Sequence, residues 1–229
     1  MIAAVLFDLD GTLLDHDRAA AEAIVQAFPD ADAAWLVPRW ANLGEAAIER
    51  YLAGELDFTG QRRARIGTLA RELGLGAWDD ARADAWFAGY TTLYKAAWRP
   101  YPDAVPAVEA LAADGLRLGV ITNGDVRQQR SKLEGIGLAG RLPHLTASSE
   151  AGCAKPAAEI FHTACAGLGL GPDAVAYVGD RLLTDAQGAA TAGLTGVWLD
   201  RSDGPAPDAP GIVRITGLDA LPRLVAGMA

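Results

Sequence analysis

Cysteine and histidine are scarce in this chain: two cysteines and three histidines occur among 229 residues. Cys153 and Cys165 do not form the spacing of a zinc motif with each other. An intracellular protein would keep both thiols reduced. We therefore expect the two cysteines to be small structural residues.

Long apolar runs and a basic leader are also missing. No stretch of about 18 uncharged apolar residues occurs, which is the length that a membrane-spanning helix needs. The N-terminus, MIAAVLFDLD, has neither the basic segment nor the cleavage site of a signal peptide. These absences predict a cytoplasmic protein with no membrane partner.

Positive charge is in deficit, with 20 Lys and Arg against 29 Asp and Glu and a net charge of −9. Binding to a nucleic-acid backbone needs a concentration of basic side chains, so we expect no nucleic-acid partner. A small phosphorylated ligand stays compatible, because local cations, a metal ion and helix N-termini can hold one anionic group on an acidic protein. No pattern in the sequence predicts an oligomeric state.

Apolar residues make up 51% of the chain, which is enough for a large core. Short apolar runs without alternation are typical of strands buried on both faces of a parallel sheet. Such runs occupy residues 3–7, 116–122, 174–179, 195–199 and, with a weaker pattern, 212–216. Helical patterns separate the later runs. The alternation predicts an α/β fold with a Rossmann-like, doubly wound parallel sheet.

Residues 16–98 break this alternation. They contain no convincing strand, and apolar residues recur there at helical spacing. The helical segments are residues 17–28, 44–54, 60–74 and 80–98. We therefore predict an all-helical insert at residues 16–98, between two parts of an α/β core domain made of residues 1–15 and 99–229.

Polar residues gather where the predicted strands end. They are Asp8, Asp10, Thr122, Asn123, Lys155, Asp180 and Asp185. Because ligands of open parallel sheets bind at the carboxyl ends of the strands, we expect these side chains to share one site. Carboxylates at one edge repel each other unless a cation lies among them, and oxygen ligands suit Mg²⁺. With a lysine nearby, the set has the composition of a magnesium-assisted phosphoryl-transfer site.

Four segments in chain order resemble the motifs of the haloacid dehalogenase (HAD) superfamily. They are DLDGT at 8–12, ITNG at 121–124, KP at 155–156 and GDRLLTD at 179–185. DLDG alone would be typical of a solvated turn, and Lys155 alone would be typical of an exposed surface cation. The order and spacing of all four segments fit the superfamily. The resemblance implies that the helical insert is a cap domain.

The resemblance also implies the roles of the carboxylates. Asp8 would be the nucleophile that forms an aspartyl phosphate, and it would also bind Mg²⁺. Asp10 would protonate the leaving oxygen, then activate the hydrolytic water, and would give the metal its backbone carbonyl. Asp180 would complete the metal site. Asp185 would either contact the metal directly or orient a ligand from a second layer, and both alternatives stay open.

The remaining motif residues would hold the phosphoryl group. Thr122 would use its hydroxyl and Asn123 its backbone N–H to bind phosphoryl oxygens. Lys155 would hold Asp8 and the transferred group in register. The sequence therefore predicts Asp8, Asp10, Thr122 and Lys155 as catalytic residues, and Thr122, Asn123 and Lys155 as substrate-binding residues.

The resulting prediction is a Mg²⁺-dependent phosphomonoester hydrolase that acts on a small phosphorylated metabolite. An acid at position 10 favours phosphate chemistry over dehalogenation, because displacement of a halide needs no protonated leaving oxygen. A phosphomutase or a dehalogenase of the same fold, and a metabolite-binding module without turnover, are the alternatives.

Overall fold

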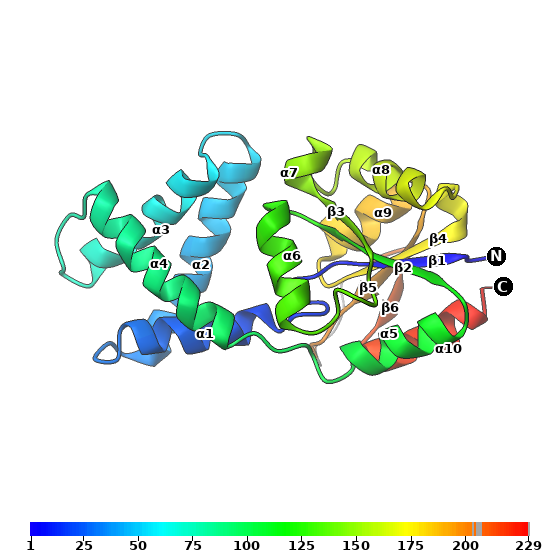
Figure 1. The fold of residues 1–229 in the computed structure, drawn as a ribbon, viewed down its shortest axis with the longest axis horizontal. Coiled ribbons are helices and arrows are strands. Elements are labelled where there is room, and N and C mark those ends of the chain that lie inside the picture. The colour runs from blue at the N-terminus through cyan, green and yellow to red at the C-terminus, as the bar shows by residue number, and fades with distance from the viewer. Residues whose placement is uncertain (203, 205–207, 229) are drawn as a thin grey trace. The chain divides into compact units, whose positions relative to one another are not determined.

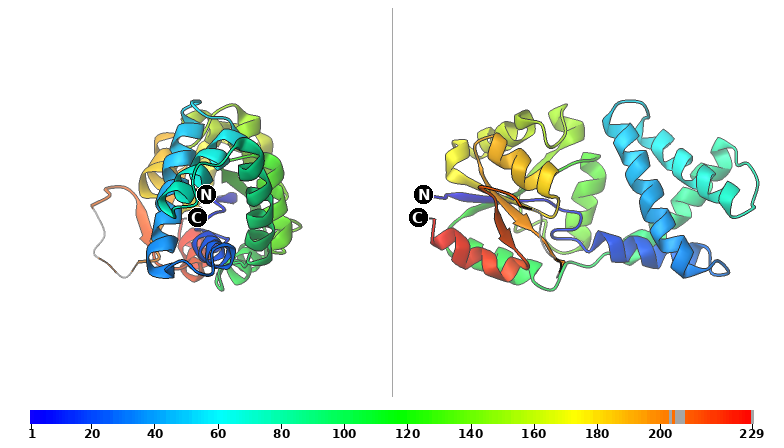
Figure 2. Two further views of the ribbon diagram at one scale, coloured as in Figure 1. Left: turned by 90° about the vertical axis from the view of Figure 1, so that its left-hand side faces the viewer. Right: turned by 180° about the vertical axis from the view of Figure 1, so that it is seen from behind.

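The computed structural model describes residues 1–202, 204 and 208–228. The chain divides into two compact units, one made of Met1–Asp15 with Arg99–Ala229 and the other of His16–Trp98. We call the first the sheet unit and the second the helical unit. Their elements can be followed in Figures 1 and 2.

Over the described residues, the sheet unit is built on a six-stranded sheet with the strand order β3-β2-β1-β4-β5-β6. The strands are β1 (Ala4–Phe7), β2 (Arg117–Thr122), β3 (His144–Ala147), β4 (Val175–Gly179), β5 (Thr195–Leu199) and β6 (Val213–Ile215). Each neighbouring pair is parallel. The strand order reverses direction after β3, so the predicted α/β, doubly wound fold is confirmed.

Helices cover both faces of this sheet. They are α5 (Ala104–Ala113), α6 (Val126–Gly135), α7 (Ser148–Ala151), α8 (Ala158–Leu168), α9 (Gly188–Thr191) and α10 (Leu221–Ala226). Short turns of other helix types occupy η1 (Pro172–Ala174), η2 (Leu182–Gln187) and η3 (Leu218–Ala220). Figure 1 shows α5 and α10 on one side of the sheet and α8 and α9 on the other.

Burial explains why the first strand lacks alternation. All four residues of β1 are buried, because β1 lies between β2 and β4 and is covered on both faces. Leu6 belongs to an apolar cluster with Phe161 of α8 and Tyr177 of β4. This packing fixes the position at which the chain leaves the sheet after Phe7.

The helical unit leaves and rejoins the sheet unit at one point. The backbone N–H of Asp15 donates to the carbonyl of Arg99 at 3.1 Å. Leu14 and Pro100 form an isolated antiparallel bridge beside this bond. The ends of the insert are therefore held together by backbone pairing that belongs to the sheet unit.

The helical unit consists of α1 (His16–Ala27), α2 (Ala33–Leu52), α3 (Phe58–Glu72) and α4 (Asp80–Ala96). Aspartates cap three of these helices: Asp32, Asp57 and Asp79 each accept a hydrogen bond from a backbone N–H of the first turn. The predicted start of the second helix at residue 44 is wrong, because α2 begins at Ala33. Pro38 lies in its second turn, where the missing N–H removes one intrahelical bond near the capped end.

Aromatic side chains fill the interior of the helical unit. Trp40 is 1% exposed and donates its Nε1–H to the hydroxyl of Tyr90 at 2.8 Å. The guanidinium of Arg65 lies 3.5 Å from the centre of the Trp40 ring and donates to the Trp40 carbonyl. Tyr94 lies next along the same helix and contacts the ring of His16. These contacts tie together all four helices of the unit.

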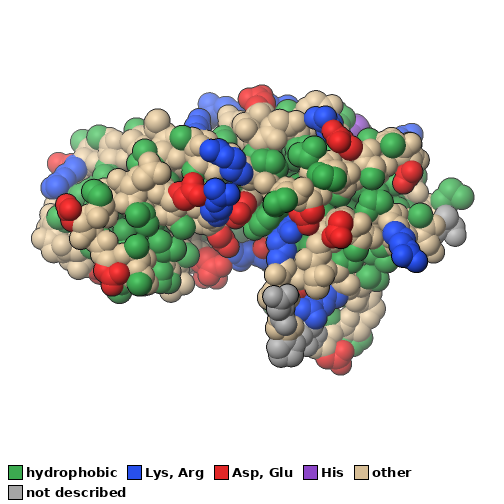
Figure 3. Space-filling view, turned by 90° about the horizontal axis from the view of Figure 1, so that it is seen from below, with side chains coloured by type: hydrophobic (Ala, Val, Ile, Leu, Met, Phe, Trp, Pro, Cys, Tyr) green, Lys and Arg blue, Asp and Glu red, His purple; other side chains and the backbone are tan. Residues whose placement is uncertain are grey.

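Several charges on the surface form pairs of opposite sign. Figure 3 shows Lys and Arg side chains beside Asp and Glu side chains on one face of the molecule. In the helical unit, Arg63 contacts both Asp80 and Asp84 at 2.5 Å. Among the described residues, no helix is both long enough and apolar enough to cross a membrane.

Candidate active site

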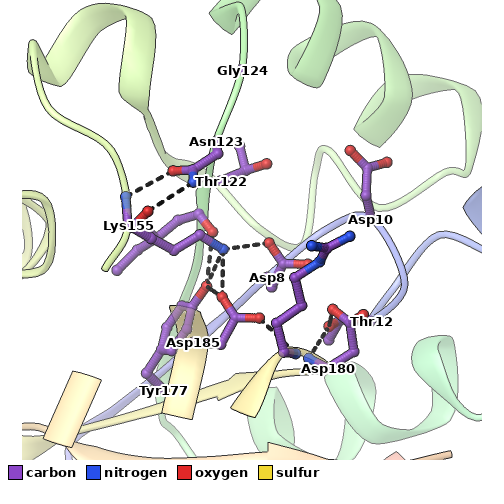
Figure 4. Close-up of polar contacts among 12 residues, drawn as sticks. Asp8, Asp10, Thr12, Thr122, Asn123, Gly124, Lys155, Tyr177, Asp180 and Asp185 are labelled. Atoms are coloured by element: carbon purple, nitrogen blue, oxygen red, sulfur yellow. Dashed lines mark hydrogen bonds and ion pairs between the residues drawn. The ribbon is translucent and has the colours of Figure 1, made fainter. Parts of the chain in front are cut away.

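The carboxyl ends of three adjacent strands meet at one edge of the sheet. Phe7 of β1 pairs with Val120 of β2 and with Val178 of β4. Asp8 follows β1 directly, Thr122 is the last residue of β2, and Asp180 follows β4 directly. Figure 4 shows these three side chains around a common space. Parallel pairing therefore brings together residues that lie far apart in the sequence.

Lys155 enters this space from the loop before α8. The side chain of Asn123 holds the Lys155 backbone from both sides: its Nδ2 donates to the Lys155 carbonyl at 3.0 Å, and its Oδ1 accepts from the Lys155 N–H at 2.8 Å. The ammonium donates to Asp8 at 2.5 Å, to Asp185 at 2.7 Å and to the hydroxyl of Tyr177 at 2.7 Å. All three donor positions of the ammonium are used.

Three carboxylates surround one point beside Lys155. Asp8, Asp180 and Asp185 each offer an oxygen, and these atoms lie within 4.8 Å of one another. Two glycines allow this approach. A Cβ on Gly11, which has φ +89°, would lie 2.6 Å from Asp180 Oδ2, and a Cβ on Gly179 would lie 2.4 Å from Asp185 Cγ.

The electrostatics of the cluster favour a bound cation. Burial raises the pKa of Asp8 to about 8; Lys155 opposes this, while Asp185 and Asp180 add to it. Burial and the Asp185 carboxylate raise the pKa of Asp180 to about 6. Burial lowers the pKa of Lys155, but Asp185 and Asp8 outweigh it and raise the pKa overall. Lys155 and Arg181 oppose the rise in the pKa of Asp180 without cancelling it. Three converging carboxylate oxygens fit a divalent cation with oxygen ligands.

Thr12 orients the Asp180 carboxylate and backbone. Its hydroxyl donates to Asp180 Oδ1 at 3.4 Å and accepts from the Asp180 N–H at 3.1 Å. The indole of Trp198 donates to the Asp180 carbonyl at 3.0 Å. The position of Asp180 is thus set by the DLDGT segment and by the neighbouring strand β5.

Both carboxylate oxygens of Asp185 accept hydrogen bonds from other groups of the protein. Its Oδ1 accepts from Lys155 and, at 3.2 Å, from Tyr177, while its Oδ2 accepts from the Arg181 N–H at 3.0 Å. The side chain is 2% exposed. These contacts fix Asp185 beside Lys155, within the group of three carboxylates that could hold a metal ion.

Asp10 lies apart from the three clustered carboxylates. Figure 4 shows its carboxylate directed away from the Lys155 cluster. Its Oδ2 accepts from Lys132 Nζ at 2.6 Å and from Gln129 Nε2 at 3.1 Å. The same Gln129 nitrogen donates to Thr122 Oγ1 at 2.5 Å. Helix α6 therefore contacts two of the residues predicted to be catalytic.

Four residues that contact the site were missed from the sequence: Thr12, Gln129, Lys132 and Tyr177. Thr12 belongs to the DLDGT motif, and its place next to a predicted metal site could have suggested a role. Gln129 and Lys132 lie three residues apart on a predicted helix that starts at the strand edge, so they share a face. Tyr177 lies inside an apolar strand, and nothing in the sequence separates it from a core residue.

Comparison with known proteins places the chain among known hydrolases. A family model described as haloacid dehalogenase-like hydrolase matches residues 2–193. A glyceraldehyde 3-phosphate phosphatase of Methanopyrus kandleri is 34% identical over 202 residues, which cover 88% of this chain and 85% of that protein. A phosphoserine phosphatase of Thermus thermophilus is 33% identical, covering 78% of this chain and 70% of that protein.

Solved structures share the fold over the whole chain. A HAD hydrolase of Bacillus subtilis, crystallised with magnesium, has a TM-score of 0.84 at 21% identity and covers 98% of this chain and 99% of its own. An L-2-haloacid dehalogenase of Xanthobacter autotrophicus has a TM-score of 0.80 at 25% identity, with both chains covered completely. Relatives of this fold therefore include enzymes of two reaction types.

Proposed function

Because this chain belongs to the haloacid dehalogenase-like hydrolases and is a phosphatase of that family, we propose that it hydrolyses small phosphorylated metabolites through an aspartyl phosphate on Asp8. The four sequence motifs predicted this family correctly. The observation that carries the mechanism is the position of Asp8: it follows β1 directly, contacts Lys155 at 2.5 Å, and shares a 4.8 Å cluster with two other carboxylates.

The first step transfers the phosphoryl group to Asp8. Lys155 occupies Oδ1 of Asp8, which leaves Oδ2 to attack phosphorus. As the new bond between Oδ2 and phosphorus forms, the bond between phosphorus and the leaving oxygen breaks, and Asp10 gives that oxygen a proton. The hydroxyl of Thr122, the backbone N–H of Asn123 and the ammonium of Lys155 stabilise the charge on the phosphoryl oxygens.

The second step releases inorganic phosphate. Asp10, now ionised, takes a proton from a water molecule that attacks phosphorus on the side opposite Asp8. The bond between phosphorus and Asp8 breaks, and Asp8 returns as a carboxylate. Asp10 is protonated again and ready for the next substrate.

We assign the cation to Mg²⁺, held by the side chains of Asp8 and Asp180 and by the backbone carbonyl of Asp10. A hard cation with oxygen ligands suits these donors. When bound, it would polarise the phosphoryl oxygens and offset the repulsion between the carboxylates. Asp185 would support the site by fixing Lys155.

The substrate is proposed to be a phosphomonoester of a small acid or sugar. The relatives bear the names of phosphatases of glyceraldehyde 3-phosphate, phosphoserine and phosphoglycolate. We propose that the helical unit, residues 16–98, is the cap domain that selects among such compounds. Phosphorylated metabolites are ionic and do not cross membranes unaided, so we place the enzyme in the cytoplasm.

Release of phosphate from a panel of these three compounds and p-nitrophenyl phosphate, with and without Mg²⁺, tests the function. We expect turnover only with the metal, and none in Asp8→Asn, whose circular dichroism should match that of the parent chain. Transfer of phosphate to a second sugar hydroxyl without release would identify a phosphomutase instead. Tight binding across the panel without release would identify a binding module.

A further inference from the structure

Helix α6 places two polar side chains in contact with the Asp10 carboxylate. Lys132 is 4% exposed and Gln129 is 2% exposed. They lie three residues apart on the buried face of α6, which also carries Leu133. Neither belongs to the motifs that predicted the site.

The buried ammonium of Lys132 pairs with the Asp10 carboxylate. Burying an ammonium group lowers stability strongly unless an anion pairs with it. In the part of the chain that the structure describes, its side chain makes one polar contact, with Asp10 Oδ2 at 2.6 Å. A leucine or methionine would fill the same space without the desolvation cost. The charge therefore serves the Asp10 carboxylate.

Gln129 connects Asp10 with the phosphate-binding Thr122. A carboxylate only accepts hydrogen bonds, so Gln129 must turn its NH₂ group toward Asp10. The same nitrogen donates to Thr122 Oγ1 at 2.5 Å. Because the hydroxyl oxygen of Thr122 accepts this bond, its hydrogen is left to donate to another group, as a phosphoryl oxygen requires.

We propose that Lys132 and Gln129 are positioning residues for catalysis: together they hold the Asp10 carboxylate in place for proton transfer and aim the Thr122 hydroxyl at the phosphoryl group. Asp10 lies two residues beyond Asp8, and its side chain, which is 27% exposed, has to keep one orientation for proton transfer. Two donors from a rigid helix supply that restraint.

This inference rests on the proposed function, in which Asp10 protonates the leaving oxygen. Substrates with different leaving groups distinguish failure of this inference from failure of the proposed function. An alkyl phosphate such as phosphoglycolate expels a basic alkoxide that needs a proton, whereas p-nitrophenyl phosphate expels a weakly basic phenolate that does not. Loss of proton transfer should therefore slow the alkyl ester more than the aryl ester.

The experiment compares kcat/KM for these two substrates in Lys132→Met, Gln129→Glu and Asp10→Asn. Lys132→Met keeps the length of the side chain and removes its charge, and Gln129→Glu keeps the shape and replaces the donor with an acceptor. In each variant, we expect kcat/KM to fall about 10-fold or more further for phosphoglycolate than for p-nitrophenyl phosphate. Asp10→Asn should show the same pattern. An equal loss for both substrates would overturn the positioning role.

A double-mutant cycle then tests whether Lys132 acts through Asp10. In an Asp10→Asn background, Lys132→Met should cause little further loss, because its target is already gone. Multiplicative losses in the double variant would show an independent, structural effect and overturn the proposal. If Asp10→Asn itself shows no preference between the two leaving groups, the acid role of Asp10 in the proposed function fails, and the inference fails with it.

Two further variants control for folding and general charge. Arg130→Met removes a cation from the exposed face of the same helix and should leave both kcat/KM values within about two-fold of the parent chain, since exposed charges act weakly. Lys132→Arg keeps the cation and should retain the leaving-group pattern of the parent enzyme. A changed leaving-group pattern in Arg130→Met would contradict the proposal. So would an unchanged pattern in both Lys132→Met and Gln129→Glu when both variants fold.

Discussion

The ammonium of Lys155 lies 2.5 Å from the Asp8 carboxylate, although 147 positions separate the two residues in the chain. Both side chains are nearly buried, with exposed fractions of 3% and 9%. Asn123 fixes the Lys155 backbone, and Tyr177 and Asp185 fix its ammonium. The proposed nucleophile is therefore held by a preorganised cation.

Removing this cation should affect both activity and stability. We expect Lys155→Met to lower kcat by about 10²–10³-fold, the range seen when one stabilising donor of a transition state is lost. The free energy of unfolding should also fall, because Asp8 and Asp185 would remain buried without their partner. Steady-state kinetics and urea unfolding measure the two effects.

A double variant separates the two effects. Lys155→Met with Asp185→Asn removes one of the stranded carboxylates, so part of the lost stability should return while kcat stays low. Recovery of kcat along with stability would mean that Lys155 acts by maintaining the fold alone.

Metal binding should be measurable without turnover. Mg²⁺ should raise the melting temperature of the parent chain, because a ligand that binds only the folded state stabilises it. The rise should be lost in Asp180→Asn, and chelation should abolish phosphatase activity until Mg²⁺ is restored. Differential scanning fluorimetry against Mg²⁺ concentration gives the first result.

Asp114→Asn is the matched control, since Asp114 is an exposed acid of the same unit outside the site. Its melting temperature should respond to Mg²⁺ as the parent chain does. A rise that persists undiminished in Asp180→Asn would argue against the assigned ligand.

The ion pair between Asp103 and Arg201 should make stability fall at acid pH. Burial alone would raise the pKa of Asp103, but hydrogen bonds from Arg201 and from the Leu218 N–H outweigh it and lower the pKa below its ordinary 3.8. The folded chain then binds this proton less readily than the unfolded chain. Its stabilisation is full above pH 3.8 and is lost as the pH falls through the lower folded-state pKa.

Asp103→Asn should therefore destabilise the protein at pH 6 by about 1–3 kcal/mol, the usual worth of hydrogen bonds to a charged group. The difference from the parent chain should shrink at pH 3. Urea unfolding at the two pH values provides the comparison, and a difference that does not change with pH would refute the assignment.

Two glycines should respond oppositely to alanine. A Cβ on Gly196 would lie 2.1 Å from the backbone oxygen of Ala186, so Gly196→Ala should lower the free energy of unfolding by about 1–3 kcal/mol. A Cβ on Gly67, inside α3, meets nothing within 4 Å. Gly67→Ala should raise the free energy of unfolding by about 0.5–1 kcal/mol. Thermal or urea unfolding of both variants measures the two changes in the free energy of unfolding. Changes of the same sign in both variants would contradict this prediction.

Much of the sheet could be predicted because its strands carry a strong signal. The run at 195–199 coincides with β5, and residues 3–7 contain β1 (Ala4–Phe7). Both are continuous apolar runs, as burial on both faces requires. The beginning of α2 could not be predicted in the same way, since Pro38 interrupts the pattern there and the cap by Asp32 depends on local geometry.

The site was predictable to the extent that its residues follow strands. Asp8, Thr122 and Asp180 were singled out because each comes at a strand end, and the structure brings all three to the same edge. The partners of Asp10 were not singled out. Lys132 and Gln129 reach it from the buried face of a helix, and the sequence does not reveal which face of α6 meets the loop after β1.

The backbone bond between Asp15 and Arg99 bears on how such enzymes diversify. Since the polypeptide departs and returns at hydrogen-bonded neighbours, an ancestor could acquire, discard or exchange the intervening segment without shifting a single strand. Under the proposed role of the helical unit, substrate selection and catalysis would lie on separate stretches of the chain.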